Sequence, residues 1–254
     1  MLKLSSLKID PEFSAQILPL SFEELQQLEL NIIAEGRLLN PIITWNGYIL
    51  DGHTRYRILK KHGFIKFEVE EIQLANKYEA LAWICKNQLG RRNLSPERKK
   101  FLLGKEYEST KLAVGGQPGN CNKVNRCDQN DHIDSEKRTC ERIAVEHGVG
   151  SATVRRAEKY MNGVEAADEA APGAREEILN GKIKAADREI CAIAKAPKEQ
   201  RSEIVAELRK PKSKRDKQIT SPTKSPSVKV ESFDDDGSRF LIGISKKYKG
   251  TKGH

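Results

Sequence analysis

The sequence predicts an α+β domain followed by an all-α domain and a basic tail. Strand-like and helix-like apolar periodicities alternate over residues 1–112, whereas only helical spacing appears over residues 136–208. From residue 209 the composition turns to Lys, Ser, Pro and Thr, which favours disorder. Residues 113–135 are rich in Gly, Asn and Asp and predict a linker or long loop. The length of 254 residues fits two domains of roughly 150 residues or fewer.

Capping and turn signals locate the elements of the first domain. Ser21 and Glu24 form a capping box that predicts a helix to Gly36. Asn46-Gly47 between two apolar runs predicts a hairpin, because both residues tolerate the positive φ of a tight turn. The other expected elements are strands over residues 4–9 and 67–72, and helices over residues 52–62 (closed by Gly63), 77–88 and 95–112.

The second domain is expected to contain helices alone. Their predicted ranges are residues 138–147, 151–161, 175–179, 185–193 and 199–208. The last three of these helices are the only sizeable candidate for a dimer interface, because nothing after residue 209 has coiled-coil spacing.

Charge is concentrated in the tail. Residues 209–254 hold 13 Lys and Arg and five Asp and Glu, so they carry +8 of the formal +9. Such a tail would add phosphate contacts that do not depend on base sequence, although a merely solvating tail fits equally well. No apolar run approaches the roughly 18 residues of a membrane span, and residues 1–10 lack the apolar stretch of a secretory signal. We therefore expect a cytoplasmic protein without membrane insertion.

The five cysteines predict neither disulfides nor a metal centre. An odd number of cysteines in a chain without an export signal favours reduced thiols. Zinc is not expected, because no Cys-x-x-Cys pair is present among the loosely spaced candidates Cys121, Cys127, His132 and Cys140. Cys85 and Cys191 fall on apolar helix faces and are expected to pack in the core.

Residues 139–156 have the spacing of a DNA-binding helix-turn-helix. Ala144 is small where two helices must cross, Gly148 follows where the turn needs a left-handed residue, and Val154 falls on the buried face. Ser151 is expected to cap the second helix, whose first turns would enter a major groove. An ordinary helical hairpin, with Gly148 only as a C-cap, is the alternative. The predicted DNA-binding residues are Ser151, Ala152, Arg155, Arg156 and Lys159.

A second candidate site is the run Asp51-Gly52-His53-Thr54-Arg55-Tyr56-Arg57, where a strand passes into a helix. Free amides at the helix start, with two arginines in the first turns, would suit an anion such as a nucleotide phosphate. Asp51 would repel phosphate unless it caps the helix or holds a bridging metal ion. A purely structural junction is an equally good interpretation of this turn.

The order of these motifs resembles that of the ParB family of partition and nucleoid-associated proteins. The resemblance rests on Asn40-Pro41-Ile42, the turn at residues 51–57, the segment at residues 87–97 and the helix-turn-helix, and it covers about residues 4–160. It implies a ParB/sulfiredoxin-like domain followed by a helical DNA-binding domain.

The resemblance also implies a nucleotide site that takes CTP with Mg²⁺. The implied nucleotide-binding residues are Gly52, His53, Thr54, Arg55, Tyr56, Arg57 and Arg91. His53 and Thr54 stand where the family motif has Glu and Arg, and Asn87 and Gln88 replace residues that support Mg²⁺ and hydrolysis. Because a neutral amide is a poorer Mg²⁺ ligand than a carboxylate, we expect slow or absent hydrolysis.

Three functions follow from these motifs. The leading hypothesis is a sequence-specific DNA-binding protein, associated with the nucleoid or a plasmid, that acts in plasmid or mobile-element partition or in transcriptional regulation. Its expected partners are double-stranded DNA, a partition ATPase and a second copy of the chain in a homodimer. The alternative is a nucleotide-dependent kinase or nuclease that uses Asp51 and Arg55. A third hypothesis makes residues 1–112 a vestigial dimerisation module beside a simple repressor.

Overall fold

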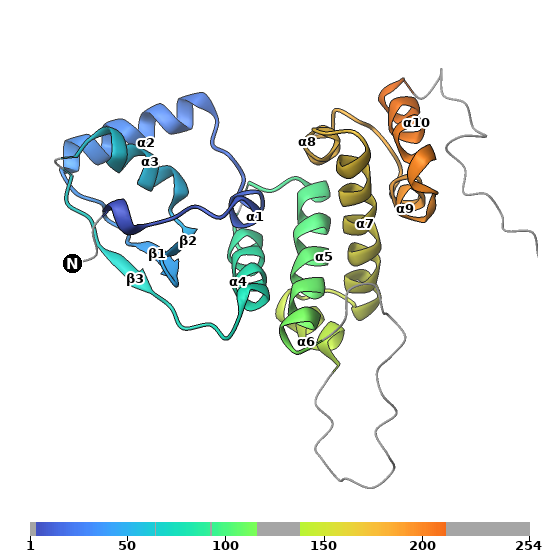
Figure 1. The fold of residues 1–254 in the computed structure, drawn as a ribbon, viewed down its shortest axis with the longest axis horizontal. Coiled ribbons are helices and arrows are strands. Elements are labelled where there is room, and N and C mark those ends of the chain that lie inside the picture. The colour runs from blue at the N-terminus through green and yellow to red at the C-terminus, as the bar shows by residue number, and fades with distance from the viewer. Residues whose placement is uncertain (1–3, 64, 92, 116–137, 212–254) are drawn as a thin grey trace, which may run out of the picture. The chain divides into compact units, whose positions relative to one another are not determined.

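The computed structural model of the chain describes residues 4–63, 65–91, 93–115 and 138–211 (Figure 1). Within these ranges the chain is helical apart from one three-stranded sheet. Residues 116–135 of the predicted linker and 212–254 of the predicted tail lie outside the described residues. The predicted domain boundary at residue 112 therefore stays a prediction.

The elements follow one another in the order η1 (Leu4–Ser6), α1 (Pro11–Ser14), α2 (Phe22–Glu35), β1 (Ile42–Trp45), β2 (Tyr48–Asp51), α3 (His53–Lys61), β3 (Val69–Glu71), α4 (Lys77–Leu89), α5 (Pro96–Ala113), α6 (Thr139–Glu146), α7 (Ser151–Ala170), α8 (Ala174–Leu179), α9 (Asp187–Lys195) and α10 (Lys198–Arg209). None of the helices in these described ranges has the length and apolar character needed to cross a membrane.

The predicted hairpin is confirmed. β1 and β2 pair antiparallel, and the turn residues Asn46 and Gly47 have φ of 49° and 76°. β3 pairs parallel to the other edge of β1, with Ile42 opposite Val69, so the strand order is β2-β1-β3. The strand expected over residues 4–9 is wrong, because its first half forms the 3-10 helix η1 and only Lys8 bridges to the sheet.

Alternate positions of β2 face two apolar layers. Ile49 packs with residues of α2 and α3, which cover one face of the sheet in Figure 1. Leu50 packs on the opposite face with Phe13 of α1 and Leu81 of α4. The sheet is therefore buried on both faces, and its β2 end leads directly into α3.

The ends of α2 and α3 test the capping residues predicted from the sequence. Ser21 accepts a hydrogen bond from the Glu24 amide while Glu24 accepts one from Ser21, so the capping box of α2 is confirmed. α3 ends at Lys61 with His62 as its C-cap, so Gly63, expected to close this helix, is the first residue beyond it.

The helical part is built on α5 and α7, which pack along one another (Figure 1). α5 also packs on α4, and α7 on α6, α8, α9 and α10. α7 runs to Ala170, well beyond the predicted end at residue 161. The helix continues through Gly163, where a Cβ would overlap the carbonyl oxygen of Ile190, so this glycine serves the close approach of α9.

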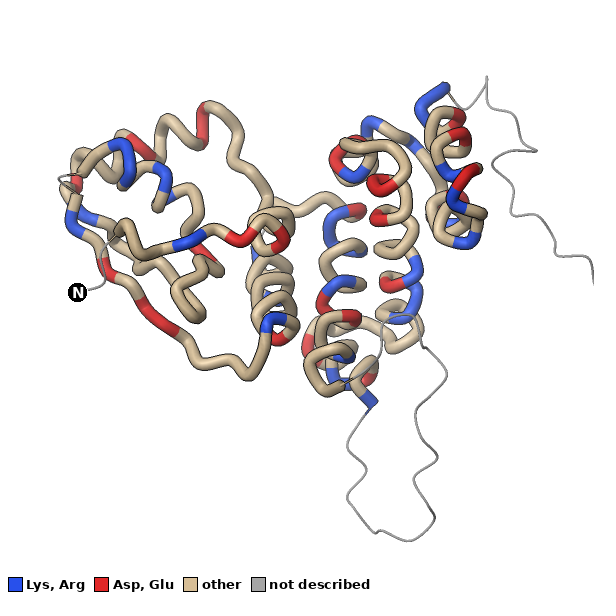
Figure 2. The backbone as a smooth tube through the Cα atoms, viewed as in Figure 1, with Lys and Arg blue, Asp and Glu red and all other residues tan. Residues whose placement is uncertain are grey.

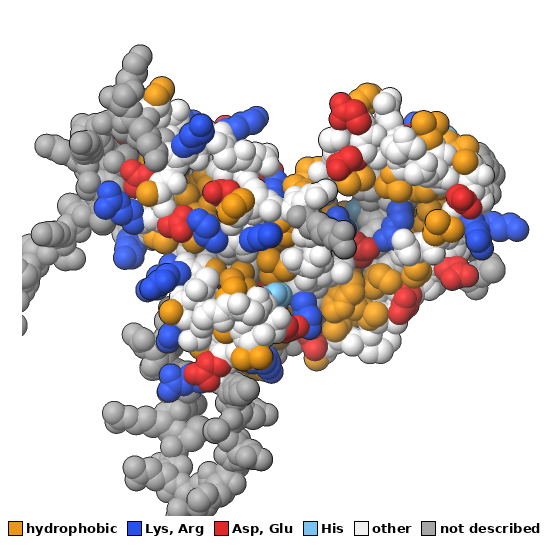
Figure 3. Space-filling view, turned by 180° about the vertical axis from the view of Figure 1, so that it is seen from behind, with side chains coloured by type: hydrophobic (Ala, Val, Ile, Leu, Met, Phe, Trp, Pro, Cys, Tyr) orange, Lys and Arg blue, Asp and Glu red, His pale blue; other side chains and the backbone are white. Residues whose placement is uncertain are grey.

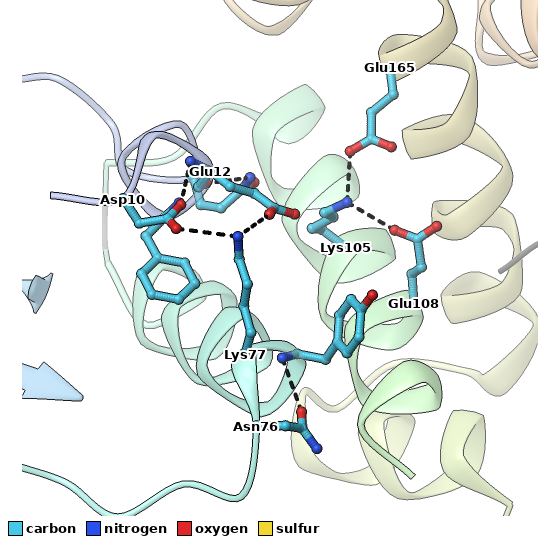
Figure 4. Close-up of polar contacts among 10 residues, drawn as sticks. Asp10, Glu12, Asn76, Lys77, Lys105, Glu108 and Glu165 are labelled. Carbon is cyan, nitrogen blue, oxygen red and sulfur yellow. Dashed lines mark hydrogen bonds and ion pairs between the residues drawn. The ribbon is translucent and has the colours of Figure 1, made fainter. Parts of the chain in front are cut away.

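Buried polar contacts join these helices. Lys105 of α5 pairs with Glu108 on its own helix and with Glu165 of α7, each at 2.9 Å (Figure 4). Burial alone would lower the pKa of Lys105, but the two carboxylates raise it. Figure 4 also shows Lys77 at the start of α4 between Asp10 and Glu12. The ammonium groups are thus neutralised where the elements meet.

Candidate functional site

The first candidate site begins at the junction of β2 and α3. Gly52 is the N-cap of α3 and has φ of 95°, a left-handed conformation that glycine adopts at little cost. A Cβ at this position would lie 3.2 Å from the Arg55 guanidinium, so a side chain would crowd that arginine as well. The absence of a side chain leaves the first amides of α3 without a side-chain cap.

Asp51 holds two arginines that come from different parts of the chain. Its Oδ2 atom accepts from Arg55 at 2.6 Å, and its Oδ1 atom accepts from Arg91 at 3.1 Å. Arg55 also donates to the carbonyl oxygen of Asn40 at 3.0 Å. Asp51 therefore does not cap the helix, which was one of the two roles considered for it, because guanidinium groups engage its carboxylate instead.

His53 is a buried imidazole without a hydrogen-bond partner. It is 4% exposed, and neither ring nitrogen has a partner in the part of the chain that the structure describes. Burial lowers its pKa to about 4, and the Arg57 charge acts in the same direction against a smaller effect of Asp51. The ring is therefore neutral near pH 7 and offers one donor and one acceptor to a ligand.

These groups line a cavity of about 580 Å³. Its polar wall holds Asp51, the first turn of α3, Arg91 and Glu70. Its apolar wall, which the sequence analysis missed, comes from residues with no shared periodicity: Ile17, Leu18, Leu20, Leu28, Pro41 and Ile43. A cavity with one apolar wall and a few charged groups is typical of small-molecule sites.

The structure brings together five of the seven predicted nucleotide-binding residues. Gly52, His53, Thr54, Arg55 and Arg91 line the cavity. Tyr56 and Arg57 do not line it. Tyr56 is buried and donates through its hydroxyl to the Leu7 carbonyl oxygen at 3.2 Å, and Arg57 is exposed.

The second candidate site is the helix pair α6–α7. Gly148 has φ of 64°, so the left-handed turn residue expected there is confirmed. Ala144 and Val154 are buried at 5% and 0% exposure and pack with Ile143 and Leu103 of α5. The helix cap expected at Ser151 is wrong, because Gly150 is the N-cap of α7 and no side chain caps this helix.

The predicted DNA-binding residues share one exposed stripe on the first half of α7. Ala152, Arg155, Arg156 and Lys159 are exposed, and Ser151 is half-buried at the helix start. Neither of the two arginines nor Lys159 forms an ion pair among the described residues. Glu158 faces the other way and pairs with Lys111 of α5. Basic positions on this half of α7 are visible in Figure 2.

A separate cluster of possible metal ligands lies near α6. Glu106, Glu146 and His147 place one ligand atom each within 4.8 Å of one another. Glu106 is buried and contacts the His147 ring at 2.8 Å, while Glu146 pairs with Lys86. These contacts already satisfy the cluster as a link between α4, α5 and α6.

The cysteine expectations are tested only in part. Cys85 is fully buried in the core, as predicted, and Cys191 is half-buried. Cys140 is a buried residue of α6 and packs in the same cluster as Leu103 of α5. Cys121, Cys127 and His132 lie outside the described residues, so the expected absence of zinc stays a prediction.

Neither a protein-family model nor a curated protein sequence matches this chain. Solved structures of ParB proteins are similar to it. A Pnob8-like ParB-N domain is 17% identical with a TM-score of 0.48, and the match covers 76% of this chain and 78% of that one.

Two further similar structures are of the C-terminally truncated chromosome-partitioning protein ParB from Caulobacter crescentus. The complex with the centromeric parS site is 17% identical, with a TM-score of 0.36, and the match covers 81% of this chain and 94% of that one. The complex with CTP-gamma-S is 16% identical, with a TM-score of 0.30, and covers 82% and 96%.

Proposed function

We propose that this chain is a sequence-specific DNA-binding protein of the ParB type whose N-terminal cavity binds a nucleoside triphosphate. The observation that carries the proposal is the exposed stripe of α7, in which Arg155, Arg156 and Lys159 have no ion-pair partner among the described residues. Most described basic side chains of α4, α5 and α10 are paired with carboxylates. Basic groups left free on one helix face favour an external polyanion.

DNA is the polyanion that this face fits. α7 follows a tight turn at Gly148, and its unpaired arginines lie within the first two turns, where a recognition helix presents side chains to base edges. An arginine can donate two hydrogen bonds to guanine and discriminate the base, or it can bind a phosphate. Ser151 and Ala152 lie at the end of the helix that would enter the groove.

The cavity supports nucleotide binding through a different set of groups. The uncapped amides at the start of α3 and the guanidinium groups of Arg55 and Arg91 suit phosphate oxygens. The apolar wall would take the less polar part of the ligand. CTP with Mg²⁺ is the ligand that the motif resemblance implies, and slow or absent hydrolysis is expected because Asn87 and Gln88 are neutral amides.

The biological setting follows from the same resemblance. We propose a role in plasmid or mobile-element partition or in transcriptional regulation, at the nucleoid or plasmid in the cytoplasm. A partition ATPase and a second copy of the chain are the proposed protein partners.

The enzyme alternative is the weaker one on structural grounds. A kinase or nuclease in this cavity would use Asp51 as a metal ligand or base. Both oxygens of the Asp51 carboxylate are already engaged, one by Arg55 and the other by Arg91. Freeing this carboxylate would break two ion pairs.

The test of DNA binding starts from unbiased selection. Sites bound by the full chain are selected from random duplex DNA, and affinities of the wild type and of Arg155→Ala/Arg156→Ala are then compared on the selected site and on scrambled DNA. We expect the double substitution to remove most of the preference for the selected site, since a base-reading arginine contributes about 1 to 3 kcal/mol of discrimination. A selected site bound equally well by both proteins would contradict the proposal.

A further inference from the structure

The exposed stripe of α7 ends where α9 crosses the helix. Ala152, Arg155, Arg156 and Lys159 recur at helical spacing along one side of α7, and Gly163 is the next position on that side. α9 covers Gly163, because a Cβ there would overlap the backbone of Ile190. α9 is therefore the element that continues the surface beyond Lys159.

The outward face of α9 is basic. Ile190 and Ile193 face the core, whereas Arg188 and Lys195 are exposed and fall on the opposite side of the helix. They are seven residues apart, which places them about 10 Å apart along the helix axis. Between them the same face holds only Cys191 and Ala192, both half-buried.

The outward face of α9 adjoins the exposed stripe of α7, because α9 packs on α7 with the backbone of Ile190 against Gly163. Burial raises the pKa of the Cys191 thiol, the Asp187 charge adds to this, and Lys195 and Lys159 both act to lower it. The charges of both lysines thus act on the same half-buried thiol, which agrees with this packing. Figure 3 shows Lys and Arg side chains gathered over the helical part of the chain on one face.

The two basic residues of α9 also lack internal partners. Neither Arg188 nor Lys195 forms an ion pair with any residue that the structure describes. The nearby acid Asp187 pairs with Lys100 at 2.7 Å. On the next helix, by contrast, Lys198 is paired with Glu169. The charges of Arg188 and Lys195 are therefore available to a ligand outside the chain.

We propose that the Arg188–Lys195 face of α9 binds phosphate groups of the same DNA duplex whose groove α7 would read. This inference rests on the proposed DNA-binding function and adds a second contact surface to it. Because α7 is the helix that would enter the groove, Arg188 and Lys195 on the neighbouring helix would meet the DNA backbone, where both side chains bind phosphate whatever the base. This face therefore supplies affinity and orientation, and the sequence preference stays with α7.

The test compares salt dependence in the full chain. Affinity for the selected site and for scrambled DNA is measured over a series of salt concentrations for the wild type and for Arg188→Ala/Lys195→Ala. We expect the slope of log affinity against log salt to fall by about 2, since each phosphate contact contributes roughly 0.9. The ratio of the two affinities should stay unchanged.

A matched control removes two exposed lysines elsewhere. Lys60→Ala/Lys66→Ala makes the same change in net charge on residues that line neither the cavity nor the stripe. Its salt slope should equal that of the wild type. An equal fall in slope for both double variants would mean that net charge alone is responsible, and it would overturn the inference.

A second measurement needs no variant. Cys191 is half-buried on α9 between Arg188 and Lys195, so DNA bound to this face should slow its reaction with a maleimide, followed at Cys191 by mass spectrometry. Either an unchanged salt slope in Arg188→Ala/Lys195→Ala or an unprotected Cys191 overturns the inference while the proposed function stands. If the wild type binds no DNA at any salt concentration, the proposed function fails and the inference fails with it.

Discussion

Arg55 and Arg91 reach the cavity from the start of α3 and the end of α4, and the Asp51 carboxylate holds both. In the described structure the lining groups therefore nearly balance in charge, with Asp51 and Glu70 against the two arginines. A bound phosphate must compete with Asp51 for these guanidinium groups or share them. The arginines are accordingly the residues on which ligand affinity should depend most.

We predict that Arg55→Ala weakens nucleoside triphosphate binding by roughly 10- to 100-fold. A hydrogen bond to a charged group contributes about 1.5 to 3 kcal/mol, and a tenfold change in affinity corresponds to about 1.4 kcal/mol. Calorimetric titration of the full chain with CTP and Mg²⁺ measures the effect, with Lys66→Ala as an exposed control. Undiminished affinity in Arg55→Ala, or no heat from the wild type with any of the four nucleotides with or without DNA, would refute it.

We predict that the folded chain loses stability in mild acid because of the buried imidazole of His53. The pKa of this imidazole is about 4 in the folded chain, against an ordinary value of 6.5, because burial disfavours the charged ring. The unfolded chain therefore binds the proton first as the pH falls. The contribution of the neutral ring to the free energy of unfolding is complete above pH 6.5. It is lost progressively between pH 6.5 and pH 4, and the total loss is on the order of 3 kcal/mol.

Urea unfolding of the wild type and of His53→Gln at pH 7 and pH 4.5 separates this effect from those of other groups. The glutamine does not titrate, so we expect the wild type to lose about 2 to 3 kcal/mol more than the variant between the two conditions. Equal losses in the two proteins would show that His53 is not responsible.

At the scale of elements, two glycines set how closely helices approach. A Cβ at Gly104 of α5 would overlap the Ala157 carbonyl oxygen of α7, and one at Gly163 would overlap that of Ile190 in α9. Backbone atoms cannot rotate out of the way as a side chain can. Both glycines are therefore required by packing, although glycine disfavours a helix interior by about 1 kcal/mol.

We predict that Gly104→Ala and Gly163→Ala each lower the free energy of unfolding by roughly 1 to 3 kcal/mol, because the helices must move apart to admit the methyl group. Gly90→Ala is the control, since Gly90 has helical angles and a Cβ there would lie 3.5 Å from its nearest neighbour. Urea denaturation checks all three variants. A gain in stability in either helix variant would mean that the helix propensity of alanine outweighs the packing.

The sequence predicted elements well wherever a local hydrogen bond or turn decides them. The capping box at Ser21 and the Asn46-Gly47 turn are of this kind, and both are confirmed. The end of α7, by contrast, was misjudged: the helix continues past residue 161 to Ala170, and Gly163 within it is explained by a helix packed against it and not by its neighbours in sequence. A local pattern cannot report a contact made by another element.

The same distinction applies to the candidate site. The turn at residues 51–57 was found because strand, glycine and helix adjoin in sequence. The pairing of Asp51 with Arg91, 40 positions away, depends on where α4 ends relative to the sheet, and no periodicity encodes it. The apolar wall was missed for the same reason, since Ile17 and Ile43 meet only in the folded chain.

At the scale of the whole molecule, the basic tail and the exposed stripe of α7 are expected to affect DNA binding differently, and the two effects can be measured separately. We expect a chain stopped at Leu208 to keep its preferred DNA site but to bind all DNA more weakly and with a shallower salt slope, because tail lysines would neutralise phosphates irrespective of sequence. Binding assays on selected and scrambled DNA over several salt concentrations measure both quantities. If the truncated chain loses its preference while Arg155→Ala/Arg156→Ala keeps it, recognition belongs to the tail.

α5 packs against α4, which borders the sheet, and also against α6, α7 and α8. Its buried side chains, Phe101 and Leu102 among them, belong to the same core as those of α7 and α10. If α4 or the helices on the other side of α5 unfolded, one side of α5 would be exposed to water. The described part of the chain should therefore melt in a single cooperative transition, with the amides of α5 among the slowest to exchange with deuterium.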